Sequence, residues 1–320
     1  MDSRDSVQRG TTVRSDRLVS GTASYRSAPI VNALTVDVED YFHVSAFAEH
    51  VPRSQWSDLE SRVVRNTERL LTMFEAAGVR ATFFVLGWVA ERFPDLVHQI
   101  ARAGHEIASH GYAHGLVYSM TAEEFRDDLR RARGALEVAC GRRVVGYRAP
   151  SYSITRQSLW ALDVLVDEGY VYDASIYPIH HDRYGIPEWT RHIHRVDRPG
   201  GGIWEVPGST NRWAATNFPV GGGGYFRLLP YRWTSRGIAR LNDLERQPAV
   251  FYLHPWEIDP EQPRLPGSAL SRFRHYRNLG KTESRLRRLL ADFRFGTVAN
   301  VLGAMAPHTG SERSGMVAAD

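Results

Sequence analysis

The sequence predicts an α/β fold in which parallel strands alternate with helices. Two observations support this prediction: short apolar or β-branched runs recur along the chain, and segments with apolar residues at helical spacing lie between them. Strands and helices that alternate at short intervals form a parallel sheet or a barrel. In such barrels the chemistry lies on loops at the carboxyl ends of the strands.

The first strand is expected at 30–38, an apolar and β-branched run that ends in acids. A helix is expected at 61–77, followed by Gly78 in the usual place of a C-cap glycine. Further elements are expected in the order strand 81–86, helix 94–103, strand 105–109, helix 121–140, strand 144–147, helix 155–168 and strand 171–172. The helix at 121 begins with a capping box formed by Thr121 and Glu124.

Beyond residue 199 the pattern changes. Glycine runs at 200–202 and 221–224 interrupt a stretch that contains Trp and Pro and has no clear helical period. We expect loops and short strands here, covering the mouth of the barrel. One more buried strand is expected at 249–253, and a last helix at about 284–292.

The composition excludes several classes of protein. The 320 residues carry a formal charge of +4, and their arginines are scattered through helical stretches, so we expect no nucleic-acid binding. A single cysteine, Cys140, excludes an internal disulfide framework and suits a reducing compartment. The polar segment 1–28 holds no apolar run long enough for a signal peptide or a membrane anchor. We therefore expect a cytoplasmic protein.

Three acids, Asp37, Glu39 and Asp40, stand at the end of the first expected strand. Carboxylates are costly to bury unless they are paired, protonated or bound to a metal. Taken alone, the cluster also fits the solvated start of a loop.

Two histidines, His110 and His114, follow the strand at 105–109. If this segment makes a helical turn, both rings project from one face and can share a cation at about 2.0–2.1 Å. Two histidines and a carboxylate, with open positions for water and substrate, are typical of a hydrolytic zinc site. Taken alone, the pair also fits two surface histidines.

Three further polar clusters end expected strands, at 148–152, 173–178 and 253–257. Arg148 can hold a carboxylate ionised and oriented, and an aspartate near a histidine can raise the pKa of the imidazole. For His254 alone, a core histidine bonded to a backbone carbonyl is the competing interpretation. Together the five clusters supply what metal-assisted hydrolysis of an amide requires.

In this order the clusters resemble the motifs of the NodB-type polysaccharide deacetylases, carbohydrate esterase family 4, over roughly residues 30–300. The run from Arg80 to Gly87 resembles the second-strand signature of that family. Four stretches are most similar to the deacetylases associated with exosortase A (PEP-CTERM) exopolysaccharide loci: 35–42, 225–231, 273–276 and 280–283. The resemblance implies a distorted (β/α) barrel with fewer than eight strands and a hydrolase that removes N-acetyl groups in exopolysaccharide biosynthesis.

The resemblance also implies a role for each matching residue: Asp37 as catalytic base, His110 and His114 as metal ligands, Arg148 as the partner that orients Asp37, His254 as general acid, and Asp173 as the residue that tunes His254. The first motif departs from the family, which has two adjacent aspartates there. The third ligand is therefore either Glu39, which shares strand parity with Asp37, or Asp40, which adjoins the loop. A second departure is Ser151, where an aromatic residue often follows the proline.

The implied cofactor is one divalent cation, zinc by default, and the implied oxyanion donor is a backbone N–H at Ser151 or Tyr152. Tyr152, Trp256 and Tyr225 are the candidate substrate-binding residues, with ordinary packing as the alternative for the two aromatic rings of Trp256 and Tyr225. The implied partner is an N-acetylated glycan or its lipid-linked precursor, with peripheral association to the exopolysaccharide assembly machinery. The sequence does not predict an oligomeric state.

The domain organisation that follows has four parts: a disordered tail at 1–28, the barrel at 29–265 with a Gly- and Trp-rich insert at about 199–248, a family-specific helical extension at 266–306, and a second disordered tail at 307–320.

Two other functions remain in competition. One is an amidohydrolase for a small cyclic amide, similar to metal-independent allantoinase relatives; the intact pair His110 and His114 argues against it. The other is an inactive sugar-binding module, which the presence of Asp37 and His254 disfavours.

Overall fold

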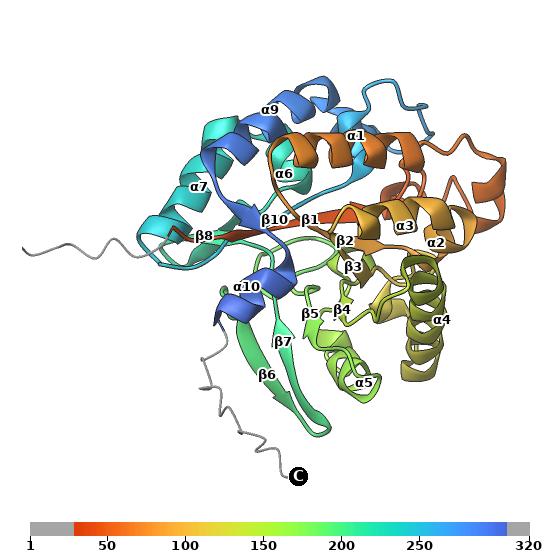
Figure 1. The fold of residues 1–320 in the computed structure, drawn as a ribbon, viewed down its shortest axis with the longest axis horizontal. Coiled ribbons are helices and arrows are strands. Elements are labelled where there is room, and N and C mark those ends of the chain that lie inside the picture. The colour runs from red at the N-terminus through yellow and green to blue at the C-terminus, as the bar shows by residue number, and fades with distance from the viewer. Residues whose placement is uncertain (1–28, 306–320) are drawn as a thin grey trace, which may run out of the picture.

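The centre of the fold is a mixed sheet surrounded by helices (Figure 1). The structure is a computed structural model that describes residues 29–305. The two expected tails lie outside the described residues. The strands of the main sheet are β1 (Asn32–Val38), β2 (Thr82–Val85), β3 (Glu106–Ser109), β4 (Gly146–Tyr147), β5 (Tyr172–Asp173), β6 (His194–Arg198), β7 (Gly201–Glu205), β10 (Val250–Leu253) and β11 (Phe295–Gly296).

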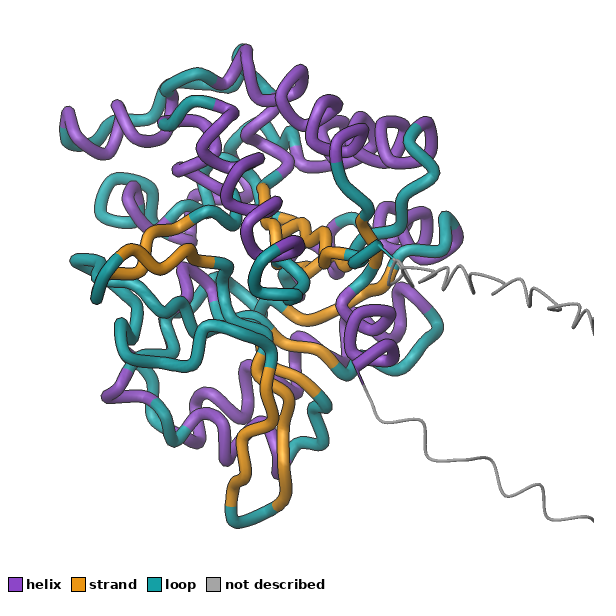
Figure 2. The backbone as a smooth tube through the Cα atoms, turned by 90° about the vertical axis from the view of Figure 1, so that its left-hand side faces the viewer, coloured by secondary structure: helices purple, strands orange, loops and turns teal. Residues whose placement is uncertain are grey.

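The sheet follows the order β10-β1-β2-β3-β4-β5-β7-β6, and β11 pairs with the start of β1. Every pairing from β10 to β7 is parallel, and only β6 runs antiparallel to its neighbour β7. The β6–β7 hairpin extends beyond the rest of the sheet (Figure 2). The predicted α/β class with a parallel sheet is confirmed. Seven consecutive strands are parallel, which agrees with the expected barrel of fewer than eight strands. With β6 and β11 the sheet has nine strands in residues 29–305.

The loop after β7 reaches the first strand of the sheet order and partly closes a distorted barrel: Gly208 N donates to the Ile176 carbonyl at 3.1 Å, and Val250 N of β10 donates to Ser209 Oγ at 2.7 Å. A separate hairpin, β8 (Thr210–Trp213) and β9 (Thr216–Pro219), leads into the glycine run, where Gly222 forms a bridge to Tyr252 on the free edge of β10. Gly222 has φ +117°, and a Cβ there would lie 2.0 Å from the Tyr252 carbonyl oxygen. The close approach of the two backbones therefore requires glycine.

The helices that follow the strands in the first half are α1 (Val63–Ala76), α2 (Gly87–Arg92), α3 (Pro94–Arg102), α4 (Ala122–Cys140) and α5 (Ala161–Asp167). The capping box of α4 is formed as expected: Thr121 Oγ1 accepts from Glu124 N at 3.2 Å, and Glu124 Oε2 accepts from Thr121 N at 2.8 Å. Five of the short 3₁₀ turns lie in this half: Ser45–Phe47, Arg53–Asp58, Val117–Ser119, Pro150–Tyr152 and Arg156–Ser158.

The second half differs from expectation in two respects. The stretch expected to hold only loops and short strands contains α6 (Gly223–Leu228) and α7 (Tyr231–Asp243). The expected extension at 266–306 contains α8 (Ala269–Tyr276), α9 (Leu279–Asp292) and α10 (Val298–Met305). It is not a separate appendage, because β11 pairs with β1 in the main sheet. Leu286 and Leu289 of α9 also belong to the main core. A sixth 3₁₀ turn, Pro255–Ile258, follows β10.

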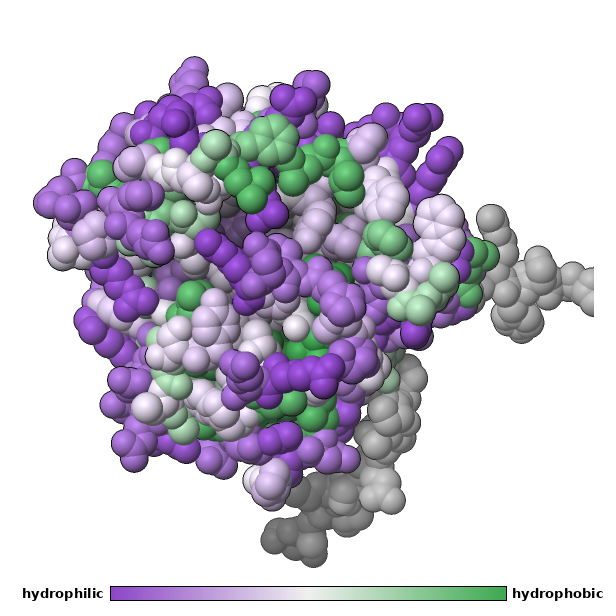
Figure 3. Space-filling view, turned by 180° about the vertical axis from the view of Figure 1, so that it is seen from behind, coloured by the Kyte–Doolittle hydropathy of each residue, from purple (hydrophilic) through white to green (hydrophobic). Residues whose placement is uncertain are grey.

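The largest core cluster packs α1, α3 and α9 against β1, β2 and β10. Its members come from both halves of the chain, so the two halves share one apolar interior. Figure 3 shows one face of the surface, on which hydrophilic side chains predominate and apolar ones form small separate groups. No helix within residues 29–305 has both the length and the apolar character needed to cross a membrane.

Candidate active site

The carboxyl ends of neighbouring parallel strands bring the chemical side chains to one rim of the sheet. Asp37 lies near the end of β1, and His254 follows β10, which pairs with β1 through Val36 and Leu253. His110 and Arg148 follow β3 and β4 respectively, and Arg148 N donates to the Ser109 carbonyl at 2.9 Å. The sequence-predicted residues Asp37, His110, Arg148 and His254 therefore meet because their strands are neighbours.

Glu39, His110 and His114 form a buried triad. Their potential ligand atoms all lie within 4.8 Å of one another. Oε2 of Glu39 lies 2.7 Å from Nε2 of His114, yet this buried oxygen accepts no hydrogen bond. A buried carboxylate oxygen without a hydrogen bond that faces an imidazole nitrogen fits a divalent cation, and one carboxylate with two imidazoles suits zinc and its neighbours.

His110 is held in the orientation that a metal ligand needs. Its Nδ1 donates to the Arg148 carbonyl oxygen at 2.8 Å, which leaves the Nε2 lone pair free. Burial, more than the neighbouring carboxylates, sets the charge of this ring and lowers the pKa of His110 to about 4. A neutral imidazole is the form that binds a cation.

The two histidines converge through a loop and not through the helical turn that their spacing suggested. Gly111 and His114 both have left-handed backbone, with φ of +71° and +52°. A Cβ at Gly111 would lie 2.9 Å from Oδ2 of Asp128, which accepts a hydrogen bond from Tyr112 N at 3.0 Å. The conformation of this loop, fixed by Asp128, places His114 opposite Glu39.

Of the two alternatives for the acidic ligand, Glu39 faces the histidines and Asp40 does not. The Asp40 carboxylate points to the start of α1, where Oδ2 accepts from Ser61 Oγ at 2.6 Å, Arg62 N at 2.8 Å and Val63 N at 3.1 Å. These donors use the oxygen that a metal would need. Burial alone would raise the pKa of the Glu39 carboxyl, but His114 and His254 outweigh it and hold that pKa well below its usual range.

Asp37 is buried beside the triad and is bonded to Arg148. Arg148 Nη1 donates to Asp37 Oδ1 at 2.7 Å and to Thr35 Oγ1 at 2.8 Å, and its Nε donates to the Ala174 carbonyl at 3.1 Å. The guanidinium also lies 4.2 Å from the centre of the Phe84 ring. These contacts fix the carboxylate of Asp37, as expected of a residue that orients a base.

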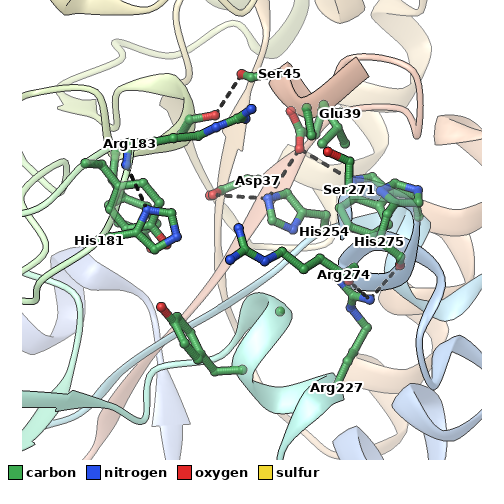
Figure 4. Close-up of a pocket in the computed structure, with 18 of the residues that line it drawn as sticks. Asp37, Glu39, Ser45, His181, Arg183, Arg227, His254, Ser271, Arg274 and His275 are labelled. Atoms are coloured by element: carbon green, nitrogen blue, oxygen red, sulfur yellow. Dashed lines mark hydrogen bonds and ion pairs between the residues drawn. The ribbon is translucent and has the colours of Figure 1, made fainter. Parts of the chain in front are cut away.

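The tuning partner of His254 is Glu257 and not Asp173. His254 Nδ1 donates to Glu257 Oε1 at 2.7 Å, while His254 Nε2 faces Oε1 of Glu39 at 3.3 Å and Oδ2 of Asp37 at 3.9 Å. Burial alone would lower the pKa of His254, but Glu39 and Glu257 raise it to about 9. Figure 4 shows the His254 ring beside Asp37 and Glu39.

Glu257 is in turn fixed by Arg227, which sequence reasoning did not single out. Arg227 Nε donates to Glu257 Oε2 at 2.6 Å, and its Nη1 donates to the carbonyl oxygens of Arg274 and His275 at 2.9 and 2.6 Å. Burial acts to raise the pKa of Glu257, but Arg227 and His254 lower it to about 2. The sequence offers a signal for each residue. Glu257 stands three residues after His254, close enough to contact it across a turn, and Arg227 lies inside the 225–231 stretch that resembles the exosortase-associated deacetylases.

Asp173 has a structural role beneath the site. Its carboxylate accepts from the hydroxyl and backbone N of Ser175, and it is paired with the buried Glu205. Ser175 Oγ accepts from Ala149 N at 2.7 Å, next to Arg148. Burial raises the pKa of Asp173 to about 6 and raises that of Glu205 well above its usual value. Through Ser175, Asp173 supports the loop that starts at Ala149.

A cavity of about 550 Å³ opens in front of Asp37, Glu39 and His254. Tyr152 and Tyr225 line it as predicted, and the buried Tyr152 hydroxyl has no hydrogen-bond partner in residues 29–305. Ser151 and Tyr152 have left-handed backbone, with φ of +54° and +53°. Such strain in two successive non-glycine residues is often found at functional sites.

Trp256 lines the same cavity but does not offer a free face to a sugar. Its ring stacks on His254 and His275, with centroid distances of 5.0 and 4.2 Å, and only 4% of the residue is exposed. Its Nε1 donates to Oε1 of Glu39 at 3.4 Å. The packing alternative therefore holds for Trp256, which positions Glu39 and His254.

Two family profiles match successive parts of the chain. Residues 56–169 match the profile described as polysaccharide deacetylase, and residues 174–303 match a domain of unknown function (DUF3473). The chain is thus similar to the polysaccharide deacetylases over residues 56–169. This segment contains His110, His114 and Arg148, whereas His254 and Glu257 belong to the second matched segment. The division at 265 expected from the sequence does not coincide with the boundary between the two profiles.

Curated relatives resemble the deacetylase domain over about a third of the chain. A peptidoglycan deacetylase from Helicobacter pylori is 32% identical over 36% of this chain and 37% of its own length. A chitooligosaccharide deacetylase from Rhizobium leguminosarum bv. trifolii is 30% identical over 36% of this chain and 49% of its own length. The match thus spans less than half of each relative.

Two solved structures share the fold. A Mycobacterium smegmatis protein assigned to the polysaccharide deacetylases superposes with a TM-score of 0.56 at 21% identity, over 87% of this chain and 93% of its own. The Puue allantoinase superposes with a TM-score of 0.51 at 17% identity, over 76% and 74%. At these identities the likeness shows the fold alone.

Proposed function

We propose that this chain is a metal-dependent hydrolase that removes N-acetyl groups from an N-acetylated glycan. The observation that carries the proposal is the buried triad of Glu39, His110 and His114 beside Asp37 and His254. The curated relatives are deacetylases of peptidoglycan and chitooligosaccharides, which supports an N-acetylated sugar as substrate.

A divalent cation held by Glu39, His110 and His114 would supply a Lewis acid for the acetyl carbonyl and for a water. Asp37 accepts the proton of the attacking water, and the hydrogen bond from Arg148 keeps this carboxylate aimed at the site. A backbone N–H of the strained turn at Ser151 and Tyr152 donates to the developing oxyanion. We take zinc as the resident metal, because a site with one carboxylate and two imidazoles suits it.

His254 delivers a proton to the departing amine. Its Nδ1 is fixed by Glu257, so Nε2 is the atom that points into the cavity. Because a bound cation would neutralise Glu39, Glu257 is the carboxylate that would keep His254 protonated in the loaded enzyme. Proton transfer from Nε2 completes hydrolysis and releases acetate and a free amino sugar.

The finer assignment concerns the biological setting. We propose a role in exopolysaccharide biosynthesis in the cytoplasm, on a polymer or its lipid-linked precursor, with peripheral association to the assembly machinery. The similarity of 35–42, 225–231, 273–276 and 280–283 to deacetylases of exosortase-associated loci supports this setting. Fractionation that finds the protein wholly in the periplasm would contradict it.

The test of the reaction is acetate release from N-acetylated oligosaccharides. We expect release by the zinc-loaded protein, loss on treatment with chelator, and recovery on addition of zinc. The Asp37→Asn variant should retain metal and lose activity, because it keeps the triad and removes the base. Hydrolysis of a cyclic amide, with no effect of chelator, would instead favour the allantoinase-like alternative.

A further inference from the structure

The cavity wall contains two arginines that the proposed chemistry does not use. Arg183 lies in the loop after β5, Arg274 lies in α8, and both line the cavity that contains Asp37 and His254. Figure 4 shows the two side chains extending from opposite sides toward the space beside Asp37. A group bound in front of the catalytic residues would therefore meet two guanidinium groups.

A third arginine in the cavity wall, Arg227, differs from these two because the protein itself uses its hydrogen-bond donors. Arg227 is buried, and its donors are used by Glu257 and by the carbonyl oxygens of Arg274, His275 and Arg277. Arg227 is thus occupied by the protein itself. Arg183 and Arg274 are exposed and retain donors for a ligand.

The positive charge of the two arginines is only weakly compensated. Arg274 Nη1 lies 3.8 Å from Asp182 Oδ2, with both side chains about half exposed at 49% and 61%, a kind of pair that contributes little in water. Asp182 also lies 3.0 Å from Nδ1 of His181. Arg183 makes no ion pair with a carboxylate in the described part of the chain.

The acids deeper in the cavity do not offer further compensation. Asp37 is already paired with Arg148, and Glu39 faces His114 and His254. A bound divalent cation would add more positive charge. The rim therefore favours a ligand that brings negative charge of its own.

We infer that the glycan substrate carries an anionic group close to the N-acetyl group that is removed, and that Arg183 and Arg274 bind this group. The inference rests on the proposed function and adds the substrate class to it. Two chemistries present such a group: the carboxylate of a uronate in the polymer, and the diphosphate of an activated or lipid-linked sugar. A guanidinium binds either one through paired charge-assisted hydrogen bonds.

The experiment compares three probes on the zinc-loaded full chain: a tetramer of N-acetylglucosamine, a tetrasaccharide of alternating glucuronate and N-acetylglucosamine, and UDP-N-acetylglucosamine. Acetate release and calorimetric binding are measured for wild type, for Arg183→Gln with Arg274→Gln, and for Arg288→Gln. Arg288 is a matched control, because it is exposed, lies outside the cavity and has one long ion pair, 3.6 Å to Asp292.

We expect the anionic probe to bind more tightly than the neutral tetramer, and each arginine to contribute about tenfold to that preference. The double variant should lose the preference and keep its activity on the neutral tetramer, and added salt should weaken the preference in wild type. The anionic probe that responds more strongly identifies the source of the charge.

Equal binding of neutral and anionic probes by wild type and the double variant would overturn the inference. If the neutral tetramer is then still deacetylated, the proposed function stands. If no probe releases acetate but the anionic ones bind in an arginine-dependent way, the proposed function fails and the anion site stands. The Arg288→Gln variant should behave as wild type throughout; a matching loss in this control would also contradict the inference.

Discussion

His254 and Glu257 are joined by a hydrogen bond of 2.7 Å between Nδ1 and Oε1, and Arg227 holds the same carboxylate from its other side at 2.6 Å. The partner of the proposed general acid thus comes from the turn that follows it in the chain. This arrangement places the acid, its partner and the arginine all within the second family segment, 174–303. The deacetylase segment, 56–169, supplies the two histidines and Arg148.

Glu257→Gln should move the alkaline limb of the pH profile to lower pH. Activity requires protonated His254 and falls as pH rises through its pKa, which Glu257 raises against the effect of burial. Loss of the Glu257 charge lowers this pKa and reduces kcat by about tenfold near pH 8. The profile of kcat against pH measures both effects.

Asp173→Asn is the control for this variant. Asp173 contacts Ser175 and Glu205 and has no hydrogen bond or ion pair with His254 within residues 29–305, so the alkaline limb should stay where it is in wild type. A shift with Asp173→Asn and none with Glu257→Gln would restore Asp173 as the tuning residue.

Asp40→Asn and Glu39→Gln should separate stability from metal binding. Asp40 accepts three hydrogen bonds at the start of α1, so its replacement should lower the free energy of unfolding by about 1–3 kcal/mol and leave the zinc stoichiometry near one. Glu39→Gln should instead lose zinc, because an amide is a poor ligand. Chemical denaturation and metal analysis of both variants make the comparison. Loss of zinc from the Asp40 variant alone would show that the ligand assignment is reversed.

The buried Asp173–Glu205 pair should make stability depend on pH. Burial raises the pKa of Asp173 to about 6 from its ordinary value of 3.8, and raises that of Glu205 further. Acids with raised folded pKa values are favoured in the protonated form, so the stability they contribute is present at low pH and is lost as pH rises through about 6 and above. In wild type the free energy of unfolding should therefore decrease between pH 5 and pH 8, and Glu205→Gln should make this decrease smaller by on the order of 1 kcal/mol.

Urea unfolding at the two pH values measures the effect. The exposed variant Glu123→Gln serves as the control and should follow wild type at both. A wild-type protein that is equally stable at pH 5 and pH 8, with Glu205→Gln behaving the same way, would show that burial does not raise the pKa values of the pair.

Much of the fold could be predicted because the local signals agree with the final structure. The capping box at Thr121 and Glu124 and the apolar run that became β1 identify their elements without reference to the rest of the chain. Helix α6 was missed because glycines stand at its start. For α7 the spacing of Thr234, Ile238 and Leu241 is already helical, so this helix could have been predicted from the sequence.

The sequence predicted which residues form the site better than it predicted which of them contact each other. Strand order brings Asp37, His110, Arg148 and His254 together, and the motifs named them. The choice between Glu39 and Asp40 depends on the direction of side chains after β1, and the partner of His254 depends on the turn at 255–258. Residue spacing alone does not determine the direction of these side chains. The His110–His114 loop is a further example, because left-handed backbone at Gly111 and His114, and not a helical turn, brings the two histidines together.

The most direct test of the central claim is an anomalous diffraction map, measured at the zinc edge, of crystals grown with zinc. We predict one strong peak among Oε2 of Glu39 and the imidazoles of His110 and His114, at a short distance from Asp37. A map in which that position is empty while zinc is bound elsewhere, or not at all, would contradict the account.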